Sequence, residues 1–385
     1  MYPDFCKIFD EEIYIVGGAV RDQLLGVEVF DVDIASAIHP HPFKVLCNKL
    51  GYKTFDTGIE HGTVTVLIDG KPYEHTTFRE DISCDGRNAS VSFSKTIEED
   101  LSRRDFTINA IAMLNDKLID PYDGQVDLQN RILKTVGIAK ERFCEDYLRI
   151  IRAARFASRL HMDIDPDLLI AAKALAPQIR EHVSVERISD EFKKAQAHGA
   201  EFLACLHSMG ILDLLFPKRS ESNSSSAWWQ EVGRASKFDI ETYFASLMRP
   251  LNDPEQVDKA CREYKLSRLI IRFSTQLVSH LPYLMSEDFS LEKSYQLIKA
   301  CGDNAQRLIN YADNVMIHNS RPSSLDKTLT HLDKIIDSIK SPLVNGGDLH
   351  KLAIKPGPEF RTILDRAALL QIEGFDKEQI LNKIT

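Results

Sequence analysis

The chain has 385 residues, of which 43% are hydrophobic and 27% charged, a composition typical of globular proteins with about two to four domains. This excludes a mini-protein or a disordered tail. The 48 Lys and Arg residues and 57 Asp and Glu residues give a formal net charge of −9. Because a surface of this sign repels polyanions, net charge alone argues against an enzyme that acts on nucleic acids.

The seven cysteines are scattered, with no C-x-x-C pair and no histidine at zinc-ligand spacing. This pattern favours free thiols in a reducing compartment. Four acidic residues within the first fifteen positions are not typical of a secretory signal, and no apolar run approaches the ~20 residues that a membrane helix needs. We therefore expect a cytoplasmic protein that does not enter a membrane.

The first 135 residues or so are predicted to form a small α/β domain. Residues 14–18 are typical of a buried strand, residues 19–26 of a helix and residues 29–35 of a second strand. Residues 64–78 are predicted to form a hairpin. Its turn is expected at Asp69-Gly70, a dipeptide that suits a tight reversal with positive φ.

From Lys140 onward, apolar and charged residues alternate at helical spacing, and almost nothing is typical of a strand. Helices are predicted over residues 145–160, 186–197, 200–216 and much of 239–340. The polar, Ser-rich stretch from Pro217 to Ala227 indicates an exposed connection between helical parts.

Asp31 and Asp33 are the strongest candidates for catalytic residues. They are spaced i, i+2 in a predicted strand, so both project from the same face, roughly 7 Å apart at their Cα atoms. Two adjacent like charges are unfavourable unless a cation lies between them, and Mg²⁺ or Mn²⁺ prefers such oxygen ligands. An isolated D-x-D is also compatible with a solvated strand face, so the surrounding residues decide between the two interpretations.

Gly17 and Gly18 lie at the strand-to-helix turn that precedes this pair. Glycines there allow backbone N–H groups to approach a phosphate, and the positive end of the following helix favours an anion. Arg21 is placed to bind a triphosphate oxygen. Glu74, in the predicted hairpin, offers a third carboxylate from a neighbouring strand. Together these residues favour a site for a nucleoside triphosphate and a metal ion.

Three motifs, in this order along the chain, are similar to those of a known family. GGAVRDQLLG…FDVDIA (residues 17–35), RRDFTINAIA (103–112) and EDYLRIIRAARF (145–156) resemble the bacterial-type (class II) tRNA nucleotidyltransferases, the CCA-adding enzymes, which are related to bacterial poly(A) polymerases. VERISDEF (185–192) and NGGDLHKLAIKPGPEF (345–360) are similar to further segments of the family. The resemblance is dense over residues 11–216 and recovers near the end of the chain.

The resemblance implies an α+β fold. An N-terminal nucleotidyltransferase head, of the polymerase β-like kind and with a mixed five-stranded β-sheet, would be followed by an all-α neck, body and tail. The implied boundaries are residues 1–137 for the catalytic head, 138–205 for the nucleotide-selecting neck, 206–320 for the body and 321–385 for the tRNA-binding tail.

The resemblance also implies an activity, the template-independent addition of CCA, from CTP and ATP, to the 3′ end of tRNA with release of pyrophosphate. Asp31 and Asp33 would bind two Mg²⁺ ions, or Mn²⁺, and Glu74 would be the third catalytic carboxylate. The implied nucleotide-binding residues are Gly17, Gly18, Arg21, Arg104, Asp105, Asn109, Asp146, Arg149, Arg152 and Arg155. No obligatory protein partner is implied.

Asp146 and Arg149 are expected to be neighbours three residues apart on one helix. A carboxylate acceptor beside an arginine donor presents a hydrogen-bonding edge to a base. The resemblance implies that this pair selects CTP or ATP without a nucleic-acid template. The alternative interpretation is an ordinary surface salt bridge worth about 0.3 kcal/mol.

The region from Arg131 to Leu160 is locally basic, with eight Lys and Arg residues and only three Asp and Glu residues. We predict that Arg152, Arg155 and Arg159 contact RNA phosphates, although a solvated helix face gives a similar pattern. Residues 81–95 match a flexible loop of the family that assists the change from C to A addition. Its predicted salt-bridging residues are Asp85, Arg87 and Lys95.

The sequence leaves several other functions open. The chain is also compatible with an enzyme that adds only CC or only A, with a poly(A) polymerase, and with an inactive relative that binds RNA or nucleotides. His75 lies next to Glu74, and we predict that it is a packed structural histidine rather than a catalytic one.

Overall fold

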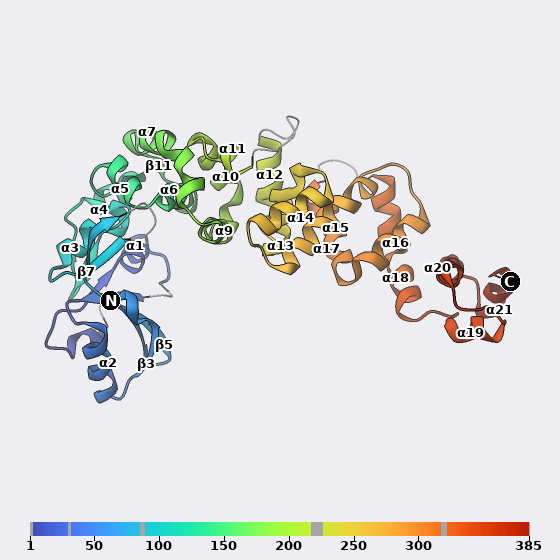
Figure 1. The fold of residues 1–385 in the computed structure, drawn as a ribbon, viewed down its shortest axis with the longest axis horizontal. Coiled ribbons are helices and arrows are strands. Elements are labelled where there is room, and N and C mark those ends of the chain that lie inside the picture. The colour runs from blue at the N-terminus through green and yellow to red at the C-terminus, as the bar shows by residue number, and fades with distance from the viewer. Residues whose placement is uncertain (1–2, 30–31, 85–88, 217–225, 317–321, 385) are drawn as a thin grey trace. The chain divides into compact units, whose positions relative to one another are not determined.

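The computed structural model describes residues 3–29, 32–84, 89–216, 226–316 and 322–384 (Figure 1). The chain divides into two compact units, Met1–Pro217 and Lys218–Thr385. This division falls within the Ser-rich stretch that was predicted to be a connection. The finer division into head, neck, body and tail stays a prediction.

A seven-stranded mixed sheet forms the centre of the first unit, in the order β3-β4-β5-β2-β1-β8-β9. β2 and β5 are parallel, and the other neighbouring pairs are antiparallel. The strands are β1 (Tyr14–Val16), β2 (Val32–Ser36), β3 (Lys53–Gly58), β4 (Thr63–Ile68), β5 (Lys71–Thr77), β8 (Ala112–Leu114) and β9 (Lys117–Ile119). The implied number of five strands is wrong, because the short hairpin of β8 and β9 extends the sheet beyond β1.

Two pairs of strands lie outside this sheet. β6 (Arg79–Cys84) and β7 (Ala89–Phe93) are antiparallel, while β10 (Ile132–Leu133) and β11 (Asp163–Ile164) are parallel. The neck was predicted to be entirely helical, so the two-residue strand β11 is a small correction to that prediction.

The predicted hairpin is confirmed as β4 and β5. Asp69 and Gly70 have φ angles of +48° and +79°. Positive φ at both central residues is what a two-residue turn of type I′ requires, and its twist matches that of the flanking strands. In β4, Val64, Val66 and Ile68 are buried and alternate with partly exposed residues, as a strand with one buried face does.

Eleven α-helices, together with short 3-10 turns, complete the described part of the first unit. They are α1 (Gly18–Leu24), α2 (Pro40–Lys49), α3 (Ile97–Ser102), α4 (Gly124–Asn130), α5 (Ala139–Glu145), α6 (Leu148–Leu160), α7 (Pro166–Leu175), α8 (Ile179–His182), α9 (Val185–Lys194), α10 (Gly199–Ser208) and α11 (Leu212–Leu215). The predicted helix over residues 145–160 is interrupted, because Asp146 has an extended backbone with φ of −155°. The predicted helix over residues 200–216 is likewise divided between Ser208 and Leu212.

The second unit is helical throughout its described residues. Its helices are α12 (Ser226–Ala235), α13 (Ile240–Met248), α14 (Pro254–Glu263), α15 (Arg268–Leu284), α16 (Leu291–Cys301), α17 (Ala305–Tyr311), α18 (Ser323–Lys340), α19 (Gly346–Lys351), α20 (Pro358–Glu373) and α21 (Lys377–Ile384). Asp239, Asp253, Ser267 and Ser290 cap the starts of α13 to α16, each by accepting a backbone N–H of the first turn. The α+β class is therefore confirmed.

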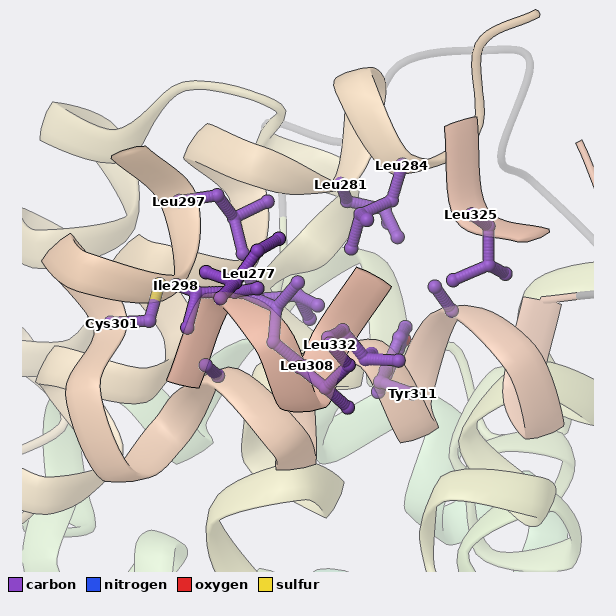
Figure 2. Packing of buried hydrophobic residues seen from close by; sticks show 14 of the residues in the cluster. Leu277, Leu281, Leu284, Leu297, Ile298, Cys301, Leu308, Tyr311, Leu325 and Leu332 are labelled. Atoms are coloured by element: carbon purple, nitrogen blue, oxygen red, sulfur yellow. The ribbon is translucent and has the colours of Figure 1, made fainter. Parts of the chain in front are cut away.

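Apolar side chains from several of these helices form the core of the second unit. Leu277 of α15, Leu308 of α17 and Leu332 of α18 belong to one buried cluster, which Figure 2 shows. Trp228 of α12 is 1% exposed, and its indole N–H donates to the carbonyl of Ser246 over 2.9 Å. None of the described helices is long and apolar enough to cross a lipid bilayer.

His75 is a structural residue, as predicted. It is completely buried in β5, where its Nε2 lies 2.8 Å from Ser36 Oγ of β2, and its ring stacks on Phe43 of α2 at 3.7 Å. Burial lowers the pKa of His75 to about 3, so the side chain is neutral in the folded protein.

This lowered pKa predicts an acid sensitivity of the first unit. Between pH 6.5 and 3 the unfolded chain binds a proton at His75 that the folded chain does not, so stability falls as the pH decreases through that window. From pH 7 to pH 5, His75 should account for a loss of about 2 kcal/mol in the free energy of unfolding.

The test is equilibrium urea unfolding at both pH values by circular dichroism, for the wild type and His75→Leu. The fluorescence of Trp228 and Trp229, the chain's two tryptophans, reports separately on the second unit. We expect the variant to be less stable at pH 7 but to lose less stability on acidification. An equal loss in both proteins would refute the assignment.

Candidate active site

The parallel pairing of β2 with β5 brings two predicted catalytic carboxylates together. In this register Asp33 is directly opposite Glu74, and both side chains are exposed. Opposite residues of paired strands project from the same face of a sheet. Asp31 lies outside the described residues, so the structure places two of the three predicted carboxylates.

Carboxylate oxygens on adjacent strands are the ligands that a hard divalent cation prefers, so Asp33 and Glu74 fit such an ion. No group of three or more His, Cys, Asp or Glu residues with metal-binding geometry is found among the described residues, which do not include Asp31.

A pocket of about 510 Å³ opens beside this pair, within the range of about 300–1,000 Å³ that is usual for small-molecule sites. Nine arginines and four carboxylates are among the described residues that line it, so its wall is strongly basic although the chain is acidic. All ten predicted nucleotide-binding residues line this pocket, namely Gly17, Gly18, Arg21, Arg104, Asp105, Asn109, Asp146, Arg149, Arg152 and Arg155.

Gly17 shapes the wall at the start of α1. Its φ is +66°, a conformation that favours glycine, and a Cβ atom there would lie 2.6 Å from Nη1 of Arg104. The strand-to-helix turn therefore lies directly against the RRDF segment, residues 103–106. Arg21, on the same helix, is only 3% exposed and donates to Oδ1 of Asn109.

The RRDF segment is fixed through Asp105. This carboxylate is 7% exposed and accepts hydrogen bonds from the amide of Asn109 at 3.0 Å and from Nε and Nη2 of Arg152 at 2.9 and 2.7 Å. Burial alone would raise the pKa of Asp105, but the Arg152 charge and the Asn109 hydrogen bond outweigh it and hold the pKa below its usual range. Asp105 is therefore charged near neutral pH.

Asp146 and Arg149 both line the pocket but do not pair with each other. Asp146 lies between α5 and α6 in an extended conformation, so the prediction that it shares a helix with Arg149 is wrong. The Asp146 oxygens accept from Nη1 and Nη2 of Arg187 at 3.1 and 2.6 Å. Arg149 contacts Glu145 and donates to the carbonyl oxygens of Arg103 and Arg142, each at 3.0 Å. The interpretation as an ordinary surface salt bridge between the two residues is therefore wrong.

The four arginines of α6 all line this pocket, but their exposure differs; they are Arg149, Arg152, Arg155 and Arg159. Arg155 is 6% exposed and its Nε donates to Glu191 of α9. The Arg159 side chain is 42% exposed and lies 3.2 Å from Asp22. Contact of Arg152, Arg155 and Arg159 with RNA stays a prediction, and Arg159 is the most accessible of the three.

Within residues 81–95, the predicted flexible loop, the described residues include most of β6 and all of β7, which pair antiparallel. The flexibility of this loop stays a prediction. Asp85 and Arg87 lie outside the described residues. Lys95 is exposed, and its backbone N–H donates to Oε2 of Glu99 at 3.2 Å. The transient salt bridges of these three residues stay a prediction.

Three arginines of the pocket were missed by the sequence analysis, namely Arg79, Arg103 and Arg187. Arg103 and Arg187 lie within RRDFTINAIA and VERISDEF, so the motifs contained the signal. Arg79 is the first residue of β6 and lies outside the quoted motifs, so no motif pointed to it.

Comparisons with known proteins agree with this geometry. Residues 13–134 match the family described as the poly A polymerase head domain, residues 161–222 a probable RNA- and SrmB-binding site of polymerase A, and residues 239–375 a putative tRNA nucleotidyltransferase domain 2. The CCA-adding enzyme of Streptococcus mutans is 38% identical, over 94% of this chain and 88% of that protein. The chain belongs to the family of CCA-adding enzymes. Its fold, a nucleotidyltransferase head followed by helical domains, is that of the family.

Further relatives support this membership. The CCA-adding enzyme of Streptococcus gordonii is 37% identical, over 94% of this chain and 90% of that protein. The solved structure of the Bacillus stearothermophilus CCA-adding enzyme in complex with CTP is 29% identical, with a TM-score of 0.79, and covers 100% of this chain and 97% of that one. The protein is thus a tRNA nucleotidyltransferase, and enzymes of this kind generally use divalent metal ions.

The ion pair between the buried Asp105 carboxylate and the partly exposed Arg152 generates a stability prediction. Arg152→Met leaves a buried carboxylate without its cation and should lower the free energy of unfolding by about 3–5 kcal/mol at pH 7. Below about pH 4 the difference should shrink, because a protonated Asp105 needs no cation. Urea unfolding, monitored by circular dichroism at both pH values, measures this difference in the free energy of unfolding between the wild type and the variant.

The matched control is Lys193→Met, which removes an exposed ion pair with Asp190 on α9. It should cost less than about 1 kcal/mol. Similar losses in the two variants would show that the Asp105 pair is not a buried structural interaction.

Proposed function

We propose that this protein adds CCA to the 3′ end of tRNA from CTP and ATP, with release of pyrophosphate and without a nucleic-acid template. The observation that carries the proposal is that one pocket contains Asp33 and Glu74 together with Asp146 and Arg149. The first two residues suit metal-dependent phosphoryl transfer, and the second two suit recognition of a base. The arginine-rich wall between them suits a triphosphate.

The carboxylates Asp31, Asp33 and Glu74 would hold two Mg²⁺ ions, with Mn²⁺ as a substitute. When bound, such ions activate the attacking 3′-hydroxyl and stabilise the charge on the departing pyrophosphate. Asp33 and Glu74 are already adjacent on β2 and β5, so these two ligands need no rearrangement of the sheet.

The arginines would bind the triphosphate. Asp100 binds Arg104 and Asp105 binds Arg152, so the positions of both guanidinium groups are set before the nucleotide arrives. A fixed guanidinium group binds phosphate oxygens at a lower cost in conformational entropy than a free one. Gly17 and Gly18 would let the backbone at the start of α1 approach the same phosphates.

Asp146 and Arg149 would select the base. Cytosine and adenine both present an amino group beside a ring nitrogen acceptor, whereas uracil and guanine present a carbonyl oxygen beside an N–H. A carboxylate that accepts and a guanidinium that donates are complementary to the first arrangement and repel the second. The contacts of Arg187 with Asp146 and of Glu145 with Arg149 hold the two side chains in place at the pocket.

The boundaries predicted above are retained within this proposal, with the head at residues 1–137 and the neck, body and tail at 138–205, 206–320 and 321–385. The end of the poly A polymerase head match at residue 134 supports the first boundary. We infer that tRNA contacts the basic region of α6 and the tail. We also infer a cytoplasmic location, which is supported by the six cysteines whose side chains the structure describes, all of them free thiols.

Removal of one metal-binding carboxylate tests the chemistry. Asp33→Asn should reduce incorporation of labelled CTP into tRNA that lacks CCA by about a thousandfold or more, because an amide does not supply the ligand charge. Asp56→Asn is the matched control, since Asp56 is an exposed aspartate of β3 that pairs with Lys44 outside the pocket. Near-normal incorporation by Asp33→Asn, with an intact fold by circular dichroism, would overturn the two-metal proposal.

Three tRNA substrates define which nucleotides are added. On tRNAs that lack CCA, CA or A, we expect the purified protein with CTP and ATP to restore the same CCA end in every case. Products that stop at CC, or addition to the CC end only, would identify an enzyme of split specificity. A long A tail would identify a poly(A) polymerase, and absence of metal-dependent pyrophosphate release would identify an inactive relative.

A further inference from the structure

Asp100 lies directly behind two arginines of the pocket wall. It belongs to α3, and its side chain is 1% exposed. Oδ1 accepts from Nε and Nη2 of Arg103 at 3.1 and 2.9 Å, and Oδ2 accepts from Nε and Nη2 of Arg104 at 3.3 and 2.9 Å. Each oxygen therefore binds one guanidinium group through the same two donors, a charge-assisted arrangement that fixes both position and orientation.

The two arginines are consecutive in the chain and carry like charges, so they would repel each other without an anion between them. Burial alone would raise the pKa of Asp100, but the charges of Arg104 and Arg103 outweigh it and keep the pKa below its usual range. The carboxylate is thus charged at neutral pH and holds both arginines, whose side chains remain 19–22% exposed at the pocket.

Asp100 also contacts the start of the hairpin of β6 and β7. The backbone N–H of Arg79, the first residue of β6, donates to Oδ1 of Asp100 at 3.4 Å. Arg79 lines the same pocket. One buried carboxylate therefore connects α3, the RRDF segment and the hairpin at the pocket wall.

We propose that Asp100 is a positioning residue for the triphosphate, which acts by fixing the guanidinium groups of Arg103 and Arg104 on the pocket wall. This inference rests on the proposed function and adds to it a residue that touches no substrate. In both arginines the bonds to Asp100 use Nε and Nη2, and Nη1 of Arg104 donates in addition to the carbonyl oxygen of Asn109 at 3.4 Å. Since the groups are ordered before binding, less conformational entropy is lost when phosphate oxygens meet them.

The test compares Asp100→Asn with Glu99→Gln in steady-state incorporation of CTP. The asparagine keeps the size of the side chain but offers one acceptor oxygen for two guanidinium groups. We expect the KM for CTP to rise about tenfold or more, while kcat changes less than about threefold. Glu99 is the exposed neighbour on α3, where it caps the helix start and does not contact these arginines, so its variant should leave both constants unchanged.

A double-mutant cycle separates positioning from a general structural role. If Asp100 acts through Arg104, Asp100→Asn should raise the KM much less in an Arg104→Met background than in the wild type. If Asp100 instead only stabilises the fold, the effects of the two substitutions on KM should multiply. The Asp100→Asn protein should then also have a lower melting temperature and a smaller active fraction.

The outcomes distinguish the two proposals. Absence of CTP incorporation by the wild type overturns the proposed function and this inference with it. A normal wild type together with an unchanged KM in Asp100→Asn, or with multiplicative effects in the cycle, overturns this inference alone.

Discussion

The parallel pairing of β2 with β5 is the constraint on which the site depends. It joins strands from two different parts of the chain and sets Asp33 opposite Glu74 on the face that carries the pocket. The other face is held by the bond between His75 and Ser36 and by the stacking of Phe43. Because side chains alternate along a strand, a shift of one residue would turn the carboxylates to that covered face. The packing behind the sheet therefore determines the chemistry in front of it.

The ion pairs at the pocket explain part of the acidic composition of the chain. Behind its arginines lie carboxylates that fix them, since Asp100 binds Arg103 and Arg104, and Asp105 binds Arg152. Single exposed ion pairs contribute little, but buried ones with complete hydrogen bonding restrict side chains strongly. A negative net charge is thus compatible with a polyanionic substrate, because some of the negative residues hold the arginines of the pocket in a fixed arrangement.

Local patterns predicted much of the fold and site, and long-range contacts account for the rest. The Asp69-Gly70 turn and the place of Glu74 beside the D-x-D strand followed from residue type and period. The family resemblance supplied the nucleotide-binding set, all of which lines one pocket. Helical periodicity did not reveal the interruption at Asp146, because apolar residues recur at helical spacing on both sides of the one extended residue. Its partner Arg187 is 41 residues away, a separation at which sequence period carries no information.

The contrast between the two units has a consequence for the order in which they form. Helices α13 to α16 begin at side-chain caps within their own first turns, and α13, α14 and α15 pack mainly on one another, so much of the second unit is built from contacts that are close in sequence. In the first unit, the parallel pairing of β2 with β5 instead requires closure of the long loop between Ser36 and Lys71. Because folding rates fall as the sequence separation of contacts grows, we expect the catalytic sheet to form after the helical unit has already condensed.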